Sequence, residues 1–444
     1  MTRIGKSGLT VLFLIASGAS LWFLAQVPRE NFPLTFLLFF IAFGSMLGMY
    51  QLSTEKLQVN QILLMGLVLR ACVFFFEPNW SEDGVRFLWD GTLVKEGKNP
   101  YLLTPEEWSK LPRDNENPFW EQSFKKLNSS TYYSVYPPLK QVLFWLGALF
   151  AQNDLHQGYL VLRGLLLGLE AGVFYLLWTL LVRFQRSEKL IFFYWFNPLV
   201  IVEIIGNLHF EGGVLFFLLL ACWGFDREKK ALSGLAWGLA VGIKLLPLLL
   251  APSLLFWKET KKNPAFWGSA FLTLMLSFSP LIFYESWKNF FQSLQLFQGK
   301  FEFNASLYYL ARTIGFWWQG YNTIEVLTKI GFGITFLGAI WISWKRSSSS
   351  IQGFLEGWVL LYLGYFLVQP VVHPWYLLPA LGISILSGKW TFILWSFGAI
   401  FSYQAYSYFP VQEKTIFLIL EYGLVGLGLY VDYFRKQRTF TLVQ

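Results

Sequence analysis

The sequence predicts an all-α, polytopic membrane protein, and three observations support this prediction. Of the 444 residues, 55% are hydrophobic and 20% aromatic, whereas only 14% are charged. Soluble globular chains average about 25% charged residues, so this chain has too few charges to coat a water-facing surface. The apolar residues fall into repeated long runs, and the mean hydropathy is +0.45. These features exclude a soluble enzyme, a disordered scaffold and a nucleic-acid-binding module, and they leave room for about ten to thirteen membrane crossings.

Basic residues predict which ends of the spans face the cytoplasm. The formal net charge is +8, from 35 Lys and Arg against 27 Asp and Glu. In membrane proteins, short loops rich in Lys and Arg stay on the cytoplasmic side. This rule predicts a protein of the cytoplasmic membrane whose long polar loop faces the periplasm or exterior. The clusters that indicate cytoplasmic ends are Arg3/Lys6, Arg183/Arg186/Lys189, Arg227/Lys229/Lys230, Lys258/Lys261/Lys262, Lys345/Arg346 and Arg435/Lys436/Arg438.

Two apolar segments do not fit a simple series of crossings. The segment 138–151 is short, and two full crossings after Pro138 would place the basic loop 183–189 on the wrong side. The segment 231–257 has basic residues at both ends and a break at Lys244–Pro247. We therefore expect the first to be re-entrant or half-depth, and the second to be a helical hairpin that dips into the membrane. Their broken backbone needs protein or water around it, which predicts an interior cavity.

A single domain over residues 1–444 is expected, with two exterior insertions. Residues 77–137 form a polar segment that holds ten of the 27 acidic residues and many aromatic ones. Because so many aromatic residues are atypical of disorder, this segment predicts a long first exterior loop carrying short helices. Residues 283–322 are amphipathic and aromatic, which predicts interfacial helices.

The most distinctive local sequence is S-E-D-G-V-R-F-L-W-D-G, residues 81–91. If this segment is helical, Asp83, Arg86 and Asp90 share one face, because they are three and four residues apart. A carboxylate base would then lie beside a guanidinium that can hold a phosphate. The alternative is a surface salt bridge between Glu82 and Arg86, followed by a turn.

Two of the three histidines stand at exterior ends of spans. His209 lies in N-L-H-F-E, next to Glu211, and His373 begins H-P-W-Y. Each could be a hydrogen-bonded structural residue, but their common depth with the acidic loop favours a function. We expect no zinc site, because no third His or Cys stands at ligand spacing on that side. We expect no cofactor, and the sequence leaves a requirement for a divalent metal ion open. The two cysteines, Cys72 and Cys222, lie inside apolar runs.

Lys244 lies in the apolar sequence G-L-A-V-G-I-K-L-L-P. An ionisable residue at membrane depth is costly and is a functional candidate by default. The alternative is that its long side chain extends to the interface. The same two interpretations apply to the charged residues inside other spans, which are Arg70, Arg163 and Glu170.

An exterior carboxylate, cations at the membrane surface and broken helices together favour glycosyl transfer from a lipid-phosphate sugar. The phosphate leaves readily, so the reaction needs a base for the acceptor hydroxyl and cations for the departing phosphate. The sugar passes through an oxocarbenium-like state, as in glycoside hydrolysis. A long lipid tail explains why such a site would lie in a membrane.

Seven motifs, in the same order, resemble bacterial polyprenyl-phosphate-sugar-dependent mannosyltransferase-like proteins of the GT-C glycosyltransferase superfamily. A more distant similarity is to the GPI-anchor first mannosyltransferase, which shares an acidic first exterior loop and an intramembrane K-x-x-P. The resemblance extends over about residues 70–422. The motifs are S-E-D-x-x-R-F-x-W-D-G (81–91), G-x-N-P-Y (97–101), Y-P-P-L (136–139), N-x-H-F-E-G (207–212), G-x-K-L-x-P (242–247), F-N-A-S-x-Y-Y-L-A-R (303–312) and H-P-W-Y (373–376).

This resemblance implies a GT-C-type transmembrane helix bundle and an inverting mechanism. It also implies a catalytic aspartate in the first exterior loop, which corresponds to Asp83, while Glu82 stands where many relatives place a second acid. We expect Arg86, Lys244 and His373 to contact the lipid phosphate. The sugar or acceptor site would be shaped by His209, Glu211 and Tyr136, and the remaining predicted substrate-binding residues are Asp90, Tyr101, Arg312 and Tyr376.

The expected reaction moves a hexose, with mannose as the first choice, from a polyprenyl-monophosphate donor to a hydroxyl of a lipid or glycan acceptor. The partners would be this donor, this acceptor and membrane lipids, and no nucleic acid. The alternatives are a multi-pass lipid or sugar transporter or flippase, and a lipid-linked acyl- or phosphotransferase of similar layout. Transporters of this size usually contain internal repeats, and the sequence shows none.

Overall fold

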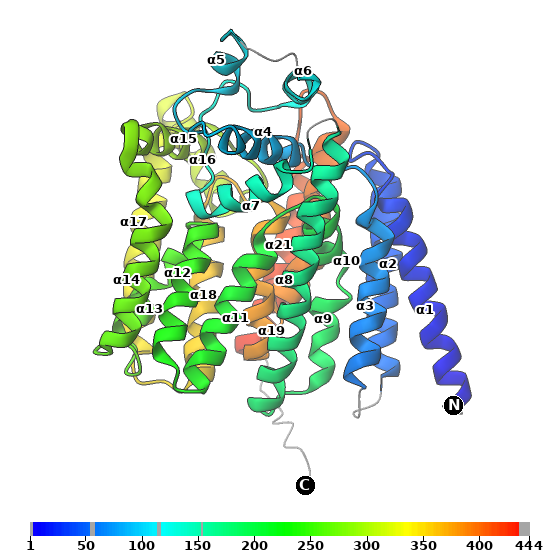
Figure 1. Ribbon diagram of the computed structural model, residues 1–444. Helices are drawn as coiled ribbons and strands as arrows, with labels where there is room; N and C mark the ends of the chain where they lie inside the picture. Colours follow the sequence, from blue (N-terminus) through cyan, green and yellow to red (C-terminus); the bar gives the residue numbers. More distant parts are fainter. Residues whose placement is uncertain (1–2, 54–57, 113–116, 152–153, 435–444) are drawn as a thin grey trace.

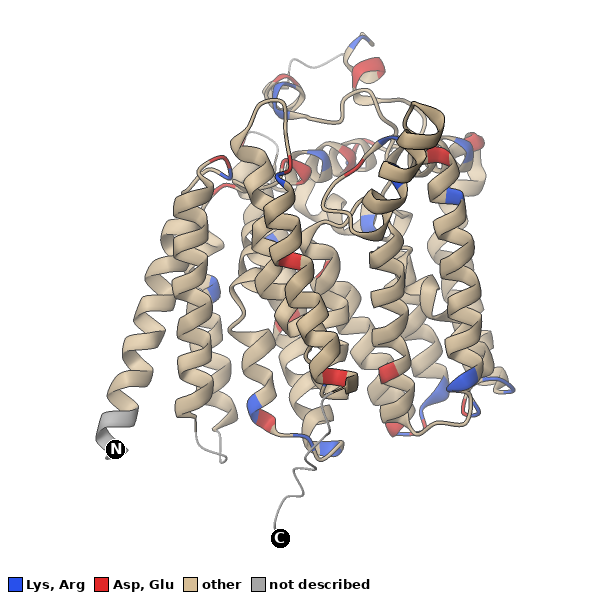
Figure 2. Ribbon diagram, turned by 180° about the vertical axis from the view of Figure 1, so that it is seen from behind, with Lys and Arg blue, Asp and Glu red and all other residues tan. Residues whose placement is uncertain are grey.

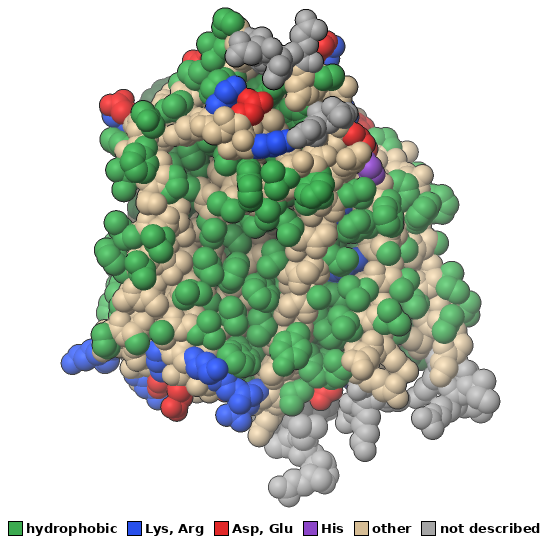
Figure 3. All heavy atoms as spheres, viewed as in Figure 1, with side chains coloured by type: hydrophobic (Ala, Val, Ile, Leu, Met, Phe, Trp, Pro, Cys, Tyr) green, Lys and Arg blue, Asp and Glu red, His purple; other side chains and the backbone are tan. Residues whose placement is uncertain are grey.

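The computed structural model describes residues 3–53, 58–112, 117–151 and 154–434, and these residues form a polytopic bundle of membrane helices (Figure 1). Within this part of the chain, seven helices are long and apolar enough to cross a membrane, and a bent pair adds an eighth. Hydrophobic side chains dominate the middle of the surface in Figure 3, and charged ones gather at its two ends. The predicted fold class, an all-α polytopic membrane protein, is confirmed.

The long spans and the shorter apolar helices pack side by side along one direction (Figure 1). Asn and Ser residues cap several of them, and Pro often occupies the first turn, where the missing N–H has no intrahelical partner. The helices that make up the bundle are α1 (Arg3–Leu24), α2 (Phe32–Leu52), α3 (Val59–Phe74), α8 (Leu155–Arg183), α11 (Glu211–Asp226), α14 (Pro264–Phe278), α17 (Ile324–Lys345), α18 (Ile351–Val368), α19 (Leu378–Ser387), α20 (Thr391–Gly398) and α21 (Thr415–Leu429).

The bundle has two chemically different ends. One end, called the basic face, carries the connections 183–189, 226–230, 258–262 and 345–350, which Figure 2 shows as clustered Lys and Arg. These connections contact one another, because Lys230 pairs with Glu259 at 3.0 Å and the Lys258 amide donates to Ser347. The N-terminal end of α1 lies at the same end in Figure 1. The predicted cluster at 435–438 lies outside the described residues.

The opposite end, called the loop face, is formed by residues 77–137 together with residues 285–322. The two segments are joined directly, since Asn289 donates to the carbonyl of Tyr101 at 2.8 Å and Ser293 donates to that of Tyr133 at 2.9 Å. The helices on this face are α4 (Asp83–Lys95), α5 (Pro105–Ser109), α6 (Pro118–Lys126), α15 (Ser286–Lys300) and α16 (Leu307–Gln319), drawn at the top of Figure 1.

The predicted hairpin is present between residues 230 and 257. Helix α12 (Lys230–Ile243) rises from the basic face, η3 (Leu246–Leu250) turns the chain, and α13 (Ala251–Phe256) returns to the same face. Fourteen residues of α12 rise about 21 Å, less than the hydrocarbon thickness of about 30 Å. Lys244 is therefore held at the break, inside the loop-face half of the bundle.

Helix α7 (Pro138–Ala148) does not cross the bundle. Its 11 residues extend over only about 16 Å, and it lies beneath α4 near the loop face (Figure 1). Gly91 of α4 allows this close approach, because a Cβ there would come within 2.3 Å of the Phe144 carbonyl oxygen. This arrangement agrees with the short, non-crossing element expected for 138–151.

A second helix is broken between residues 188 and 206. It consists of η1 (Glu188–Ile191), α9 (Phe192–Trp195), α10 (Pro198–Val200) and the π-helical turn η2 (Ile201–Gly206), with a bend of 45°. The Arg163 guanidinium donates to the carbonyls of Ile205 and Gly206, both at 2.7 Å, and to those of Phe74 and Phe76. Arg163 thus satisfies backbone groups that two helix ends would otherwise leave unpaired at membrane depth.

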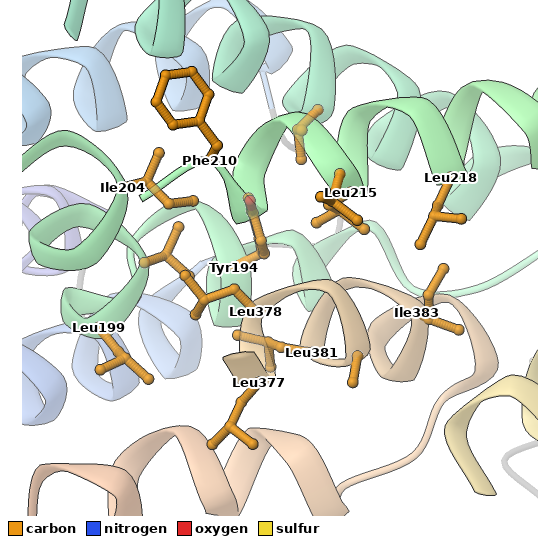
Figure 4. Packing of buried hydrophobic residues seen from close by; sticks show 14 of the residues in the cluster. Tyr194, Leu199, Ile204, Phe210, Leu215, Leu218, Leu377, Leu378, Leu381 and Ile383 are labelled. Carbon is orange, nitrogen blue, oxygen red and sulfur yellow. The ribbon is translucent and has the colours of Figure 1, made fainter. Parts of the chain in front are cut away.

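Large apolar side chains make up most of the core around this broken helix. Figure 4 shows residues of the broken helix, of α11 and of α19 packed against one another. The bundle centre is therefore rigid, and the break in the helix is supported from both sides. The labelled side chains are Tyr194, Leu199, Ile204, Phe210, Leu215, Leu218, Leu377, Leu378, Leu381 and Ile383.

A buried ion pair fastens α3 to α8. Arg70 Nη2 lies 2.7 Å from Glu170 Oε2, and both side chains are fully buried. Arg70 also donates to the carbonyl of Trp195 at 2.9 Å, and Tyr194 donates to Glu170 at 2.7 Å. These contacts give Arg70, Arg163 and Glu170 structural partners, which answers the ambiguity left by the sequence.

Replacing Glu170 alone with Leu should lower the free energy of unfolding by about 3–5 kcal/mol, because the Arg70 guanidinium would remain buried without a counter-charge. Thermal unfolding of the purified protein in detergent measures this change. The double variant, Arg70→Met with Glu170→Leu, should recover most of the loss. A single variant as stable as the wild-type protein would contradict this account.

Candidate active site

Asp83 is the first residue of α4 and lies where the loop face meets the bundle. The preceding segment is fixed by Trp80, whose amide donates to Asn207 at 3.2 Å and whose indole donates to the Val27 carbonyl at 3.1 Å. This anchoring brings Asp83 Oδ2 to 3.9 Å from His209 Nε2. The Asp83 side chain is 33% exposed, whereas that of His209 is 3% exposed. Asp83 can therefore meet a substrate from the loop face.

His209 is oriented by a second carboxylate below it. Glu203 Oε2 lies 2.9 Å from His209 Nδ1 and accepts from Asn207 at 3.2 Å, while Tyr403 donates to the other oxygen. An ionised carboxylate can only accept, so the contact places a proton on Nδ1. His209 Nε2 then faces Asp83 and has no hydrogen-bond partner among the described residues. Asp83, His209 and Glu203 therefore lie in a row, in which His209 contacts Glu203 directly while its Nε2 stays 3.9 Å from Asp83, longer than a hydrogen bond.

The backbone at Leu208 adopts a strained conformation, which turns the chain between Glu203 and His209. Leu208 has a φ of 65°, a left-handed conformation that bulky residues rarely adopt. The turn brings the His209 amide back to donate to the Glu203 carbonyl at 3.0 Å. Such strain persists only where the surrounding structure imposes it, and it is frequent at functional sites.

The charge state of Asp83 depends on opposing effects. Burial raises the pKa of the Asp83 carboxyl above that of an ordinary aspartate, and the nearby Glu82 and Glu211 act in the same direction. His209 and Lys140 favour the ionised form and lower this pKa. A carboxylate with a raised pKa is a better proton acceptor than an ordinary one.

An aromatic column continues from His209 into the bundle. The Trp375 ring stacks on His209 at 3.8 Å between centroids and on His373 at 4.4 Å, and Phe303 stacks on the far side of His373 at 4.9 Å. His373 is thus separated from Asp83 by the indole and by His209. Burial lowers the pKa of His373 to about 3, and His209 and Lys244 contribute in the same direction.

Two lysines lie on the other side of the site. Lys244 forms an ion pair with Glu211 at the start of α11, and its ammonium lies 3.8 Å from the centre of the Tyr376 ring. Lys140, at the start of α7, lies among Phe87, Tyr136, Phe144 and Phe210.

Lys140 differs from Lys244 because it has no carboxylate partner. No Asp or Glu oxygen in the described part of the chain lies within 4.0 Å of its ammonium. Burial lowers the pKa of Lys140 to about 8, and Lys244 adds to this effect, whereas Glu211 and Asp83 oppose it. A buried ammonium that stacks on aromatic rings and has no carboxylate within ion-pair distance remains available to an anionic ligand.

Arg86 and Asp90 are not directed toward Asp83. The predicted helix is present, but Arg86 Nε pairs with Asp90 at 2.8 Å, and its Nη1 donates to the carbonyls of Ser129 and Tyr132. Asp90 also accepts from Ser134 at 2.5 Å and from Gln141 at 3.2 Å. In this structure the pair ties α4 to residues 129–141.

Glu82 has a different partner from the one considered in the sequence. It pairs with Arg29, in the α1–α2 connection, and accepts from Asn128 at 3.1 Å. Arg29 also lies over the Tyr406 ring at 4.4 Å. The alternative of a Glu82–Arg86 salt bridge is therefore wrong, because each residue is engaged elsewhere.

Three other predicted residues join segments of the loop face. The Tyr101 hydroxyl donates to the Tyr136 carbonyl at 2.5 Å, and the Tyr136 ring covers Lys140 at 4.6 Å. Arg312, on α16, pairs with Glu302 and lies over Tyr309 at 4.5 Å. The structure thus places Tyr136 beside the lysine, and gives Tyr101 and Arg312 partners within the loop face.

Sequence reasoning missed two residues of this site. Glu203 was a lone acid inside the apolar run I-V-E-I-I-G, which is itself a signal of function at membrane depth. Lys140 follows Y-P-P-L and carries the same signal. Across the described residues, no three His, Cys, Asp or Glu side chains gather as metal ligands. The expected absence of a zinc site and of a cofactor nevertheless stays a prediction, and dependence on a divalent metal ion stays open.

The fold and site define a membrane-embedded helical protein with a carboxylate, a histidine and two lysines on one face. The profile of glycosyltransferase family 87 matches residues 134–370, more than half of the chain. The chain therefore belongs to glycosyltransferase family 87 and is a membrane glycosyltransferase. The match contains Lys140, Glu203, His209 and Lys244, whereas Asp83 and His373 lie outside it.

No curated protein and no solved structure matches this chain. The family assignment supports the transferase, and nothing favours the transporter or flippase considered above.

His373 should stay neutral throughout the physiological range. An ordinary histidine titrates near pH 6.5, but burial holds the pKa of His373 at about 3. Nitrogen NMR of histidine-labelled protein should therefore show one resonance that does not shift between about pH 8 and about pH 5. The chain has only three histidines, so the loss of one signal in His373→Gln assigns it. A titrating His373 would contradict the buried position.

Proposed function

We propose that this protein transfers a hexose, with mannose the first choice, from a polyprenyl-monophosphate donor to an acceptor hydroxyl at the loop face. The observation that supports this proposal is the row of Asp83, His209 and Glu203, in which His209 Nε2 faces Asp83 without a hydrogen bond, with Lys140 nearby and without a carboxylate partner among the described residues. Family membership gives the glycosyl transfer. The donor, the acceptor and the GT-C-type mechanism belong to the proposal.

The site chemistry follows from the charges in place. Asp83 accepts the proton of the acceptor hydroxyl while the acceptor oxygen bonds to C1 of the sugar. The bond between C1 and the phosphate oxygen breaks, and the phosphate leaves with the electron pair. Attack from the side opposite the phosphate inverts the configuration at C1. No strong acid is needed, because the phosphate leaves as a stabilised anion.

The histidine and the lysines have distinct roles in this proposal. His209 can share the proton taken up by Asp83, since Glu203 holds its other nitrogen. Lys140 and Lys244 lie where negative charge on the departing phosphate needs a preorganised cation. Lys140 is the stronger candidate, because the Lys244 ammonium is already paired with Glu211.

Four of the predicted substrate-binding residues would act by holding helices in place: Arg86, Asp90, Tyr101 and Arg312. Their protein partners suggest that they hold α4, the loop and α16 in place around the substrate rather than contact the phosphate themselves. Glu82 and His373 would act in the same way, through Arg29 and through Trp375. Glu211, Tyr136 and Tyr376 surround the lysines and would line the sugar or phosphate site.

The proposed orientation places the loop face in the periplasm or exterior of the cytoplasmic membrane. The support is the segregation of Lys and Arg onto the opposite face, as the positive-inside rule requires. The exposed apolar side chains of the spans, such as Leu12, Phe332 and Leu337, would contact lipid.

Asp83→Asn should abolish transfer of radiolabelled sugar from synthetic polyprenyl-phosphate-mannose, or from the glucose donor. The variant removes the proton acceptor and leaves the shape of the site unchanged. The matched control is Glu121→Gln, an exposed acid of the same loop that pairs only with Lys125. The control should transfer normally. Turnover retained by Asp83→Asn at equal protein yield would contradict the assignment of the base.

The transfer rate should fall toward acidic pH as Asp83 gains a proton. Because the pKa of Asp83 is raised, the midpoint should lie above the ordinary value of about 3.9. Lys140 favours the ionised carboxylate, so Lys140→Met should move the midpoint further upward. The measurement is the pH dependence of kcat/KM, with Lys98→Met, at the far end of α4, as the control. If the midpoint is the same in Lys140→Met as in the wild-type protein, Lys140 does not act on the Asp83 carboxylate.

A further inference from the structure

Glu421 is a fully buried acid in α21, away from the residues assigned above. One of its oxygens, Oε1, accepts from Asn304 Nδ2 at 2.9 Å and from Trp395 Nε1 at 2.8 Å. The other oxygen, Oε2, is buried and has no hydrogen-bond partner among the described residues. Glu421 belongs to none of the ion pairs found in that part of the chain.

Asn304, which donates to Glu421, also has a buried side-chain oxygen without a hydrogen-bond partner among the described residues. Its side chain is buried, and Nδ2 donates to Glu421 and to the Val372 carbonyl at 3.2 Å. Its backbone is also held, because the amide donates to Glu413 at 2.6 Å and the carbonyl accepts from Tyr422 at 2.6 Å. The amide oxygen Oδ1 alone has no partner within the described ranges. Two unpartnered acceptors therefore lie on two side chains that already share a hydrogen bond.

We propose that Glu421 is a neutral carboxylic acid whose Oε2–H donates to Asn304 Oδ1 and closes a reciprocal acid–amide pair. A single proton then satisfies both unpartnered oxygens. An ionised carboxylate would lie here without a counter-charge, which is far more costly than leaving an ordinary hydrogen bond unmade.

The surrounding groups agree with a neutral acid. The titratable groups that face the pair are Glu413, before α21, Tyr422, on α21, and Tyr309, on α16, which donates to Glu413. Glu413 is negative when ionised, and neither tyrosine supplies a positive charge. Arg312 acts on Glu413 but forms its ion pair with Glu302. Nothing positive in the described residues therefore offsets a charge on Glu421.

The pair also positions the aromatic column of the active site. Phe303 precedes Asn304, its amide donates to the Pro370 carbonyl, and its carbonyl accepts from the Val372 amide, both at 2.9 Å. The Phe303 ring stacks on His373, which stacks on Trp375. Glu421 is thus a positioning residue for His209. This last step rests on the proposed function, whereas the protonation of Glu421 does not.

The test compares Glu421→Gln with Glu421→Leu. A glutamine amide donates through Nε2 and accepts through Oε1, so it reproduces both bonds of the neutral acid. Glu421→Gln should unfold at the wild-type temperature or above and should retain transfer within about twofold, because no buried partner is left unpaired. Glu421→Leu should unfold at a lower temperature and lose most of the sugar-transfer activity. A leucine side chain cannot accept hydrogen bonds, so it leaves the Asn304 amide and the Trp395 indole without their acceptor.

Infrared difference spectroscopy reads the proton directly and needs no activity. The wild-type protein should show the carbonyl band of a protonated carboxylic acid that is absent from Glu421→Gln. The wild-type protein should also lose thermal stability relative to Glu421→Gln as the pH rises, because ionisation of Glu421 breaks the pair. If wild-type protein showed no sugar transfer at all, the proposed function would fail. The infrared band and the stability comparison would still show whether Glu421 is protonated and paired with Asn304.

The outcome that would overturn the proposal is a missing carboxylic-acid band together with a Glu421→Gln variant as unstable as Glu421→Leu. Glu421 would then be ionised, and a water molecule or a cation would occupy the space between Oε2 and Asn304.

Discussion

The guanidinium of Arg163 supports the feature on which the active site depends, a helix that breaks inside the bundle. Its contacts with the carbonyls of Ile205, Gly206, Phe74 and Phe76 supply donors where neither water nor a regular helix can. In hydrocarbon an unpaired carbonyl costs several kcal/mol, so the break is stable only with such a partner. Glu203 lies within the broken helix, and His209 follows it directly. Arg163 therefore supports the backbone that carries both residues, while contacts with Asn207 and Tyr403 hold the Glu203 side chain.

Buried polar and charged groups need partners inside a membrane protein, and this need explains which charged residues have structural roles. Arg70 pairs with Glu170 between two spans, and Arg86 pairs with Asp90 beneath the first loop, although Arg70 Nε and Arg86 Nη2 have no hydrogen-bond partner among the described residues. A cation that already has a counter-charge within the protein attracts an anionic ligand less strongly than one that has none. His209 Nε2 and Lys140 differ, because they are buried beside Asp83 and lack such partners among the described residues. The candidate site is therefore a region where a histidine nitrogen lacks a hydrogen bond and a lysine lacks a counter-charge among the described residues.

Much of the architecture followed from the sequence because membrane depth restricts the possibilities. The charge deficit predicted the helix bundle, and basic residues at both ends of 231–257 predicted the hairpin that holds Lys244. For the site, adjacency to spans was sufficient to place Asp83, His209 and Lys244 on one face. Helical spacing was misleading for Arg86, since a shared face does not determine which partner a guanidinium takes.

The features of the candidate site that the sequence did not predict depend on contacts between residues distant in sequence. Glu203 meets Tyr403 across the fold, and Glu82 meets Arg29 rather than the nearby Arg86. Trp375 separates the two histidines, which no spacing rule could reveal. The seven long spans and one bent pair also show that several apolar runs form short or broken helices. Hydropathy alone measures apolar length and does not detect where the backbone breaks.

In the proposed mechanism, Asp83 and Lys140 lie on either side of the bond that breaks. The most direct measurement is an electron cryo-microscopy structure of the Asp83→Asn protein with an intact polyprenyl-phosphate-hexose donor bound. We expect the donor phosphate within hydrogen-bond distance of the Lys140 ammonium, with C1 of the sugar facing the residue at position 83. A phosphate bound at the basic face, or beside Arg312 and away from Lys140, would rule out this mechanism.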